Sequence, residues 1–221
     1  MEGLLRQVDG YCERTDFSYW AEPINAVTNL AFIIAALVMA RRVQGMGMPL
    51  ALALCAILFA IGTGSYLFHT HATIWGMLAD VVPIGLFILL YLYVVQREFV
   101  GMGRWVALGA TALFIPYAAI ITPLLSALPF LSISNFYWSV PLLLFIYGFG
   151  LRNRLPETAR GMVLGGLLLC LSITVRSIDE MLCTALPMGT HWLWHCLNGL
   201  MLGWMIEVYR RDRLARAQTL A

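Results

Sequence analysis

Residues 49–71 read PLALALCAILFAIGTGSYLFHTH, an apolar run whose last turns contain a serine and two histidines. About 20 apolar residues are enough to cross a bilayer as a helix. Polar groups at membrane depth are costly, so Ser65, His69 and His71 are expected to have a partner or a task there. This segment therefore predicts a transmembrane helix that carries a polar site at one end.

The whole chain has the composition of an integral membrane protein. It has 221 residues, 61% of them hydrophobic and 12% charged, with a mean hydropathy of +0.80, which excludes an ordinary soluble domain. We expect an all-α membrane protein, a seven-transmembrane helix bundle that forms a single domain over residues 1–221. The predicted spans are Ala21–Ala40, Pro49–Phe68, Met77–Val95, Trp105–Leu125, Asn135–Gly150, Gly161–Ile178 and His191–Tyr209. They leave a polar N-terminal segment, residues 1–20, and a basic tail, residues 210–221.

The distribution of positive charge predicts the orientation of this bundle. All 14 basic residues are arginines, and eleven of them lie in alternate loops or in the tail, which the positive-inside rule places in the cytoplasm. The N-terminus and the loops near His71, Pro129 and Cys183 are then outside or lumenal, and the C-terminus is cytoplasmic. Short loops and arginine as the only basic residue fit a bacterial inner membrane, with the endoplasmic reticulum or Golgi membrane as the alternative. The net charge of +2 reflects this sorting and indicates no nucleic-acid partner.

All four histidines lie near the outer ends of the second and seventh predicted helices. Ser65 and His69 are four residues apart and share one helix face, and His191 and His195 repeat that spacing. Asp80 enters the third helix soon after His69, and a carboxylate there should face inward. Three neutral imidazoles with an open fourth position are a typical ligand set of catalytic zinc. We therefore predict that His69, His191 and His195 bind zinc.

Two of the polar residues have a simpler alternative interpretation. His71 points to a different helix face from His69 and is expected in a loop or an interface. Ser65 can serve as a catalytic residue, or it can satisfy a backbone carbonyl of its own helix, as buried serines in membrane helices commonly do.

The motifs GSYLFH, LADVVP and HWLWH, together with the N-terminal stretch YCERTDFSYWAEPINAVTN, resemble those of the alkaline ceramidases. This family is part of a superfamily of seven-helix membrane hydrolases that also includes the adiponectin-receptor-like proteins. The resemblance spans nearly the whole chain, with little to compare in the fourth and fifth helices. It implies an amidase that cleaves ceramide-like lipids to a sphingoid base and a free fatty acid. It also implies that Asp80 hydrogen-bonds the water at the zinc and that Ser65 assists at the carbonyl oxygen.

The resemblance further implies a calcium ion beside the zinc site. Glu13 and Glu22 occupy matching positions, and oxygen ligands suit a hard cation. The pattern departs from the family at Gly10, where the family has an aspartate, with Asp9 one place earlier, and at Thr15, where it has an asparagine. The calcium expectation therefore depends on Asp9, Glu13 and Glu22. The alternative is that Glu13, Asp16 and Glu22 form a solvated acidic cap.

The cysteines divide into two groups. Cys12 and Cys183 fall in outer segments, where an oxidising compartment permits a disulfide, and the resemblance suggests that these two are paired. The other three, Cys55, Cys170 and Cys196, lie within helices and are interpreted as small packing residues.

Other functional classes fit less well than an enzyme. A receptor of the adiponectin-receptor type shares the zinc constellation, but it resembles an inverted bundle with a cytosolic N-terminus. A retinal pigment is excluded because the chain has no lysine for a Schiff base. A transporter would use charges within the membrane, and these are limited to Asp80, Arg176 and the Asp179–Glu180 pair. The expected partners are a ceramide-like substrate and membrane lipids, with the oligomeric state left open.

Overall fold

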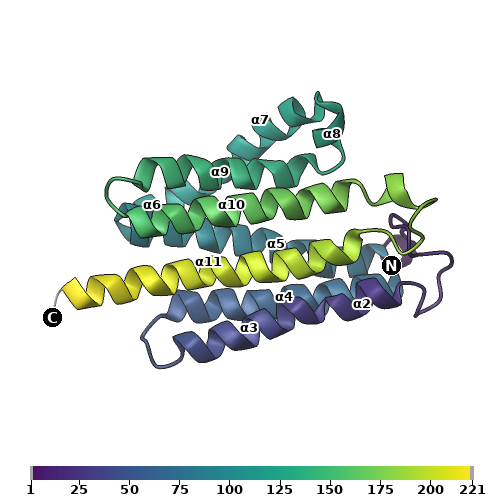
Figure 1. Ribbon diagram of the computed structural model, residues 1–221, viewed down its shortest axis with the longest axis horizontal. Coiled ribbons are helices and arrows are strands. Elements are labelled where there is room, and N and C mark those ends of the chain that lie inside the picture. The colour runs from purple at the N-terminus through teal and green to yellow at the C-terminus, as the bar shows by residue number, and fades with distance from the viewer. Residues whose placement is uncertain (1, 220–221) are drawn as a thin grey trace.

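The computed structural model describes residues 2–219, which form a bundle of long, roughly parallel helices (Figure 1). The helices are α1 (Glu2–Leu5), α2 (Pro23–Thr28), α3 (Leu30–Val43), α4 (Pro49–His71), α5 (Ile74–Val94), the π-helix η1 (Val95–Val100), α6 (Arg104–Ala112), α7 (Phe114–Ser126), α8 (Pro129–Ser132), α9 (Asn135–Leu151), α10 (Pro156–Ser177), the 3-10 helix η2 (Glu180–Leu182) and α11 (His191–Thr219).

Five helical stretches are long and apolar enough to cross a membrane. They are Pro23–Val43, Pro49–His71, Ile74–Val100, Arg104–Ser126 and Pro156–Ser177. The helix α9 is apolar but has only 17 residues, and α11 is long but carries histidines, Asn198 and Glu207 among its apolar residues. Each of the seven predicted segments thus corresponds to a helical rod, and five of them meet both criteria of a span.

The largest difference from the predicted boundaries lies at the C-terminus. The seventh segment was expected to end at Tyr209, but α11 continues to Thr219, so the basic tail is helical as far as it is described. Ion pairs between residues three or four apart stabilise this extension. Glu207 pairs with Arg210 at 2.7 Å and with Arg211 at 2.8 Å, and Asp212 and Arg216 form a further pair. Residues 220 and 221 of the predicted tail lie outside the described residues.

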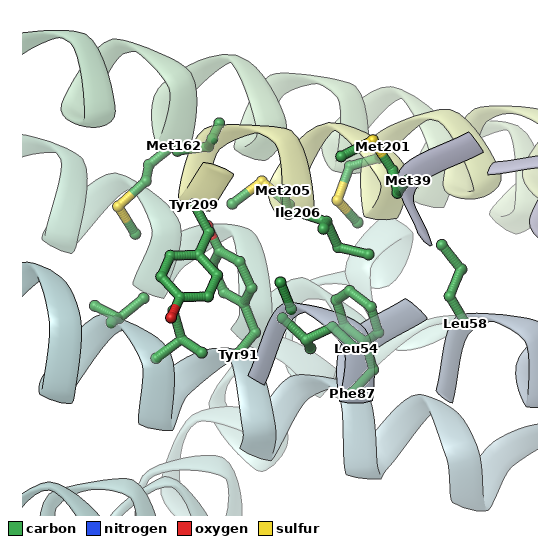
Figure 2. Close-up of a cluster of buried hydrophobic side chains, with 14 of the residues drawn as sticks. Met39, Leu54, Leu58, Phe87, Tyr91, Met162, Met201, Met205, Ile206 and Tyr209 are labelled. Atoms are coloured by element: carbon green, nitrogen blue, oxygen red, sulfur yellow. The ribbon is translucent and has the colours of Figure 1, made fainter. Parts of the chain in front are cut away.

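The core lies between α3, α4, α5, α10 and α11 and is rich in methionine and aromatic side chains (Figure 2). Its labelled members are Met39, Leu54, Leu58, Phe87, Tyr91, Met162, Met201, Met205, Ile206 and Tyr209. Flexible methionine side chains fill irregular gaps between helices that cross at different depths. The stretch formed by α6 and α7, Arg104–Ser126, lies outside this core, with only 11% of its apolar window buried.

Glycines allow the central helices to approach closely. A Cβ atom on Gly64 of α4 would lie 1.9 Å from the carbonyl oxygen of Ala79 and 3.1 Å from the backbone nitrogen of Asp80 in α5. In the same way, a Cβ on Gly199 of α11 would lie 2.9 Å from the carbonyl carbon of Ala31 in α3. Small residues at such crossings let membrane helices pack backbone to backbone. The Gly64 crossing brings Ser65 beside Asp80.

One end of the bundle is covered by the N-terminal segment. Gln7 forms an isolated antiparallel bridge with Thr73, and the amide of Val8 donates to the carbonyl of Ala72 at 2.8 Å. At the opposite end, Glu207 of α11 pairs with Arg42 in the last turn of α3. The side of the membrane that each end faces stays a prediction.

Gly64→Ala is expected to destabilise the bundle, because the added methyl group would meet the Ala79 backbone rather than a movable side chain. Overpacking of this kind costs about 1–3 kcal/mol of unfolding free energy. The matched control is Gly85→Ala on α5, where a Cβ would meet nothing within 4 Å. Thermal unfolding of the purified variants in detergent measures both, and equal melting temperatures would contradict the close crossing.

Candidate metal centre

Three histidine side chains meet near the covered end of the bundle. His69 comes from the last turn of α4, and His191 and His195 come from the first two turns of α11. All three are buried, and one potential ligand nitrogen from each lies within 4.8 Å of the others. Over residues 2–219, this is the one group of three or more histidine, cysteine or acidic residues that is arranged to hold a metal ion.

The hydrogen bonds of two rings determine which nitrogens face the centre. Nδ1 of His69 lies 2.5 Å from the Glu22 carboxylate, to which it donates. The Thr28 hydroxyl donates its single proton to a backbone carbonyl one turn earlier, so it accepts from Nδ1 of His195 at 2.9 Å. A neutral imidazole that carries its proton on Nδ1 presents an unprotonated Nε2, which is the form that binds metals.

Three ring nitrogens remain without a protein partner among the described residues. They are Nε2 of His69, Nε2 of His195 and Nδ1 of His191, all buried. Buried polar atoms in native proteins are almost always hydrogen-bonded or bound to an ion. One nitrogen from each of the three imidazoles lies within 4.8 Å of the others, a spacing that fits a tetrahedral metal ion with one position left open.

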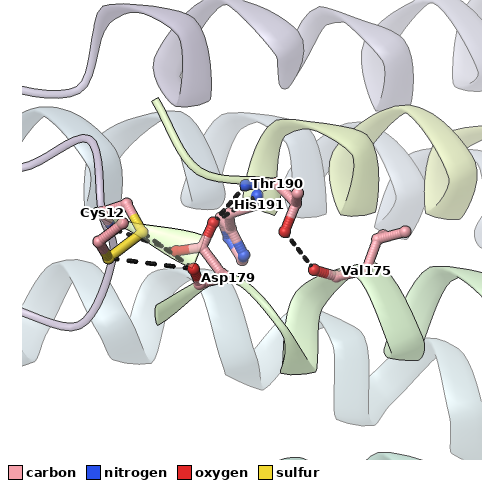
Figure 3. The surroundings of a disulfide bond; sticks show 6 residues. Cys12, Val175, Asp179, Thr190 and His191 are labelled. Atoms are coloured by element: carbon pink, nitrogen blue, oxygen red, sulfur yellow. Dashed lines mark hydrogen bonds between the residues drawn. A yellow bond between two sulfur atoms is a disulfide. The ribbon is translucent and has the colours of Figure 1, made fainter. Parts of the chain in front are cut away.

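His191 is positioned by a carboxylate that the sequence analysis did not assign to the site. Asp179 is buried, and its Oδ1 accepts the backbone amides of Thr190 at 2.5 Å and His191 at 2.8 Å, which caps the start of α11 (Figure 3). Its Oδ2 accepts the amide of Cys12 at 3.1 Å. Asp179 is 12 residues away from His191 along the chain, so no local motif marks this contact.

The structure contains a disulfide between Cys12 and Cys183. It joins the N-terminal segment to the loop before α11, directly beside Asp179 (Figure 3). The residue before Cys12 is Tyr11, whose ring stacks on His191 with 3.7 Å between ring centroids. The disulfide therefore holds an aromatic side chain against one of the three imidazoles.

Asp80 and Ser65 lie next to the histidines. Asp80 lines a cavity of about 370 Å³ together with His191, Tyr137 and Arg176. Ser65 is buried and follows Gly64, the residue at which α4 touches the backbone of Asp80 in α5. A carboxylate at this position can accept and return a proton at the centre without taking one of the ligand positions.

Arg176 is a further cation in the same cavity. Its guanidinium donates to the Ser134 hydroxyl at 2.7 Å and lies 5.3 Å from the ring centroid of Tyr137 and 5.6 Å from that of Trp194. The sequence marked Arg176 as a charge within a membrane helix, but it contained no sign of these partners. His71, by contrast, is exposed, and its ring lies against Trp75, outside the cluster.

The acidic residues of the calcium expectation do not fit a calcium ion. The two oxygens of Glu13 accept the amides of Ile24 and Asn25 at 2.7 and 2.8 Å. Glu22 accepts from His69, Asn25 and the Arg14 guanidinium, and Asp9 is exposed. Burial alone would raise the pKa of Glu22, but its hydrogen bonds from His69 and Asn25 and the charge of Arg14 lower it below the ordinary value. Glu22 is thus committed to three nitrogen donors, Glu13 turns both oxygens to backbone amides, and Asp9 lies outside the buried network, which is a poor ligand set for a hard cation.

The comparison with known proteins gives one family. The sequence model of the family described as Ceramidase matches residues 9–217, which is almost the whole chain and includes every member of the cluster. None of the curated proteins matches the sequence significantly.

Metal analysis of the purified protein is expected to find about one tightly held ion per chain, because three imidazoles from two packed helices preorganise one tetrahedral site. His191→Ala should lose the ion. His71→Ala is the control, because its ring points away from the cluster, and it should keep the ion. Equal loss from both variants would contradict this choice of ligands.

Cleavage of the disulfide is expected to lower stability. Cys183→Ser opens a cross-link that spans 171 residues, and the loss of a native disulfide typically costs about 2–4 kcal/mol of unfolding free energy. Thermal unfolding with and without a reducing agent measures the effect, after mass mapping of the intact bond. Cys170→Ser, which removes a free thiol within α10, is the control. Equal melting temperatures of the reduced and the oxidised protein would refute the prediction.

Proposed function

Because the chain belongs to the ceramidase family, we propose that it is a zinc-dependent membrane amidase that hydrolyses the amide bond of ceramide-like lipids to a sphingoid base and a free fatty acid. Family membership implies a hydrolase that acts on the ceramide amide bond. The observation that carries the proposal for this chain is the set of three buried, unpartnered imidazole nitrogens beside Asp80. That set combines metal ligands with a proton acceptor.

The donor set supports zinc as the ion. All three ligands are neutral nitrogens, and each sits on a rigid helix, which suits a d¹⁰ ion without redox chemistry. Zinc bound here would polarise a carbonyl oxygen and lower the pKa of a water molecule. The carboxylate of Glu22 and the hydroxyl of Thr28 hold two of the rings in the required tautomer.

Asp80 is the proposed general base and acid. Its carboxylate would take a proton from the attacking water and deliver it to the leaving amine of the sphingoid base. Ser65 lies beside Asp80 at the Gly64 crossing, so it could orient that carboxylate or donate a hydrogen bond to the oxygen of the tetrahedral intermediate.

The cavities beside the centre suit an amphipathic substrate. The 370 Å³ cavity offers Tyr137 and Arg176 to polar groups, and it shares Ile84, Tyr137 and Trp194 with a narrow apolar cavity of about 70 Å³. The apolar cavity runs between α3, α4, α5, α9, α10 and α11. A lipid whose polar amide lies at the histidines could therefore place an alkyl chain among apolar side chains.

The proposal includes a seven-span topology with the metal centre at the outer face. Arginine-rich loops gather at the end opposite the histidines, so the positive-inside rule places the N-terminus and the centre outside and α11's last turns in the cytoplasm. A bacterial inner membrane fits this arrangement best, and the endoplasmic reticulum or Golgi membrane is the alternative. The amide of a membrane lipid lies at the headgroup boundary, the depth at which long apolar helices end.

The test of function is the release of fatty acid and sphingoid base from short- and long-chain ceramides by the purified protein in detergent, with His195→Ala as the blank. Asp80→Asn should keep the metal but lose about 10²- to 10⁴-fold in rate, because a positioned base is lost while the ligands remain. Ser65→Ala should lose less than Asp80→Asn, and at most about 10²- to 10³-fold if it also stabilises the oxyanion.

The matched control is Glu157→Gln, a carboxylate-to-amide change on an exposed residue at the far end, which should behave as wild type. If Asp80→Asn turned over at the wild-type rate, the role proposed for Asp80 would be contradicted, while the proposal that the chain is an amidase would stand. A metal-loaded wild type without turnover would overturn the amidase and favour a receptor of the adiponectin-receptor type.

A further inference from the structure

A buried arginine lies directly behind the metal centre. Arg14 belongs to the N-terminal segment, yet its side chain is only 1% exposed. A buried charge is tolerated only when it is paired and fully hydrogen-bonded. Here Nε lies 2.5 Å from the Glu22 carboxylate, and the other two nitrogens donate to the carbonyls of Asp16 and His69 at 3.0 and 2.9 Å.

Two of these contacts converge on the same metal ligand. Through Glu22, Arg14 supports the ring of His69, because the second oxygen of Glu22 accepts from its Nδ1. Directly, Arg14 binds the backbone carbonyl of His69. That carbonyl lies in the last turn of α4, where carbonyl oxygens lack a partner within the helix and the helix dipole favours a positive charge. Arg14 thus holds His69 at its backbone and at its ring.

The position of this guanidinium accounts for the poor fit to calcium. A divalent ion near Glu13 and Glu22 would have to bind oxygens that already accept hydrogen bonds from the amides of Ile24 and Asn25 and from Arg14. The positive charge that such an ion would supply is present as a side chain. The arginine also follows Cys12 by two residues, so the disulfide keeps it in place.

We propose that Arg14 is a built-in cation that takes the place of a second metal ion and positions Glu22 and His69, so that the centre works without calcium. Arg14 acts through these two residues and is therefore a positioning residue. The proposal rests on metal binding by the three histidines, as in the proposed function, and is independent of the substrate.

The first arm of the test uses the wild-type chain in detergent. Metal analysis should find zinc without stoichiometric calcium. Calcium chloride on the order of 10 mM, which would fill even a weak site, should change neither the melting temperature nor the zinc affinity relative to sodium chloride of equal ionic strength. Any ion that binds the folded state would raise its stability, so a calcium-dependent rise in either quantity would overturn the proposal.

The second arm measures zinc affinity by competition with a chelator in three variants. Arg14→Gln removes the charge and should weaken zinc binding by about 10- to 100-fold, the usual effect of losing a partner that orients a ligand. Arg14→Lys restores the charge and should recover part of that loss. Arg160→Gln, which breaks an exposed ion pair with Glu157, is the matched control and should bind zinc as wild type does.

The proposal would be overturned if Arg14→Gln bound zinc as tightly as wild type does, or if Arg14→Lys recovered none of the lost affinity. A purely structural arginine predicts no dependence of zinc affinity on the charge at this position. If Arg14→Gln fails to fold, Arg14→Lys and the wild-type calcium titration decide the matter. A wild type that holds no zinc would overturn the proposed function instead, and the melting temperature in calcium would still test the role of Arg14.

Discussion

Three imidazoles are buried at the end of an apolar bundle, and their polar atoms need partners from the surrounding residues. Each ring leaves one buried nitrogen without a protein partner, so the rest of the residue must be held by other polar groups. Glu22 does this for His69 and Thr28 does it for His195, while Asp179 fixes the backbone at His191. In a low-dielectric interior these partners must themselves be satisfied, which is why the polar network extends beyond the histidines.

The N-terminal segment supplies most of that extension. Its residues 11–14 act in succession: Tyr11 stacks on His191, Cys12 forms the disulfide and donates to Asp179, Glu13 caps α2, and Arg14 neutralises Glu22. Irregular backbone is tolerated in a membrane protein only where protein groups or water satisfy it. Here the segment folds over the ends of the helices, satisfies its own polar groups and shields the centre in a single arrangement.

The same bundle must also admit a substrate. Close packing at Gly64 and Gly199 draws α4 against α5 and α11 against α3, which gathers the histidines, Ser65 and Asp80 at one depth. Away from these crossings the helices carry larger side chains. A polar cavity lies there at Asp80, and an apolar cavity adjoins it. A rigid ligand set beside an open, amphipathic cavity is what an amidase for lipids requires, since the chemistry needs precision and the alkyl chain needs only apolar room.

The amino-acid sequence by itself determined the apolar rods and the three histidines, because both depend on local spacing. Helical periodicity alone places His191 with His195, and Ser65 with His69, on one face. The resemblance to a known family pointed to the pairing of Cys12 with Cys183 and to calcium, and the structure contains the first but does not fit the second. The helical extension of α11 to Thr219 was missed because apolarity, rather than ion pairing, had been used to place its end.

Only the tertiary structure decided which partners hold the centre. Arg14 and His69 are 55 residues apart, Glu22 and His69 are 47 apart, and Cys12 and Asp179 are 167 apart. No periodicity relates such positions, because their contact depends on how the helices cross and where the N-terminal segment folds back. The roles of Arg14 and Asp179 therefore follow from three-dimensional packing, whereas the histidines were visible from the spacing within single helices.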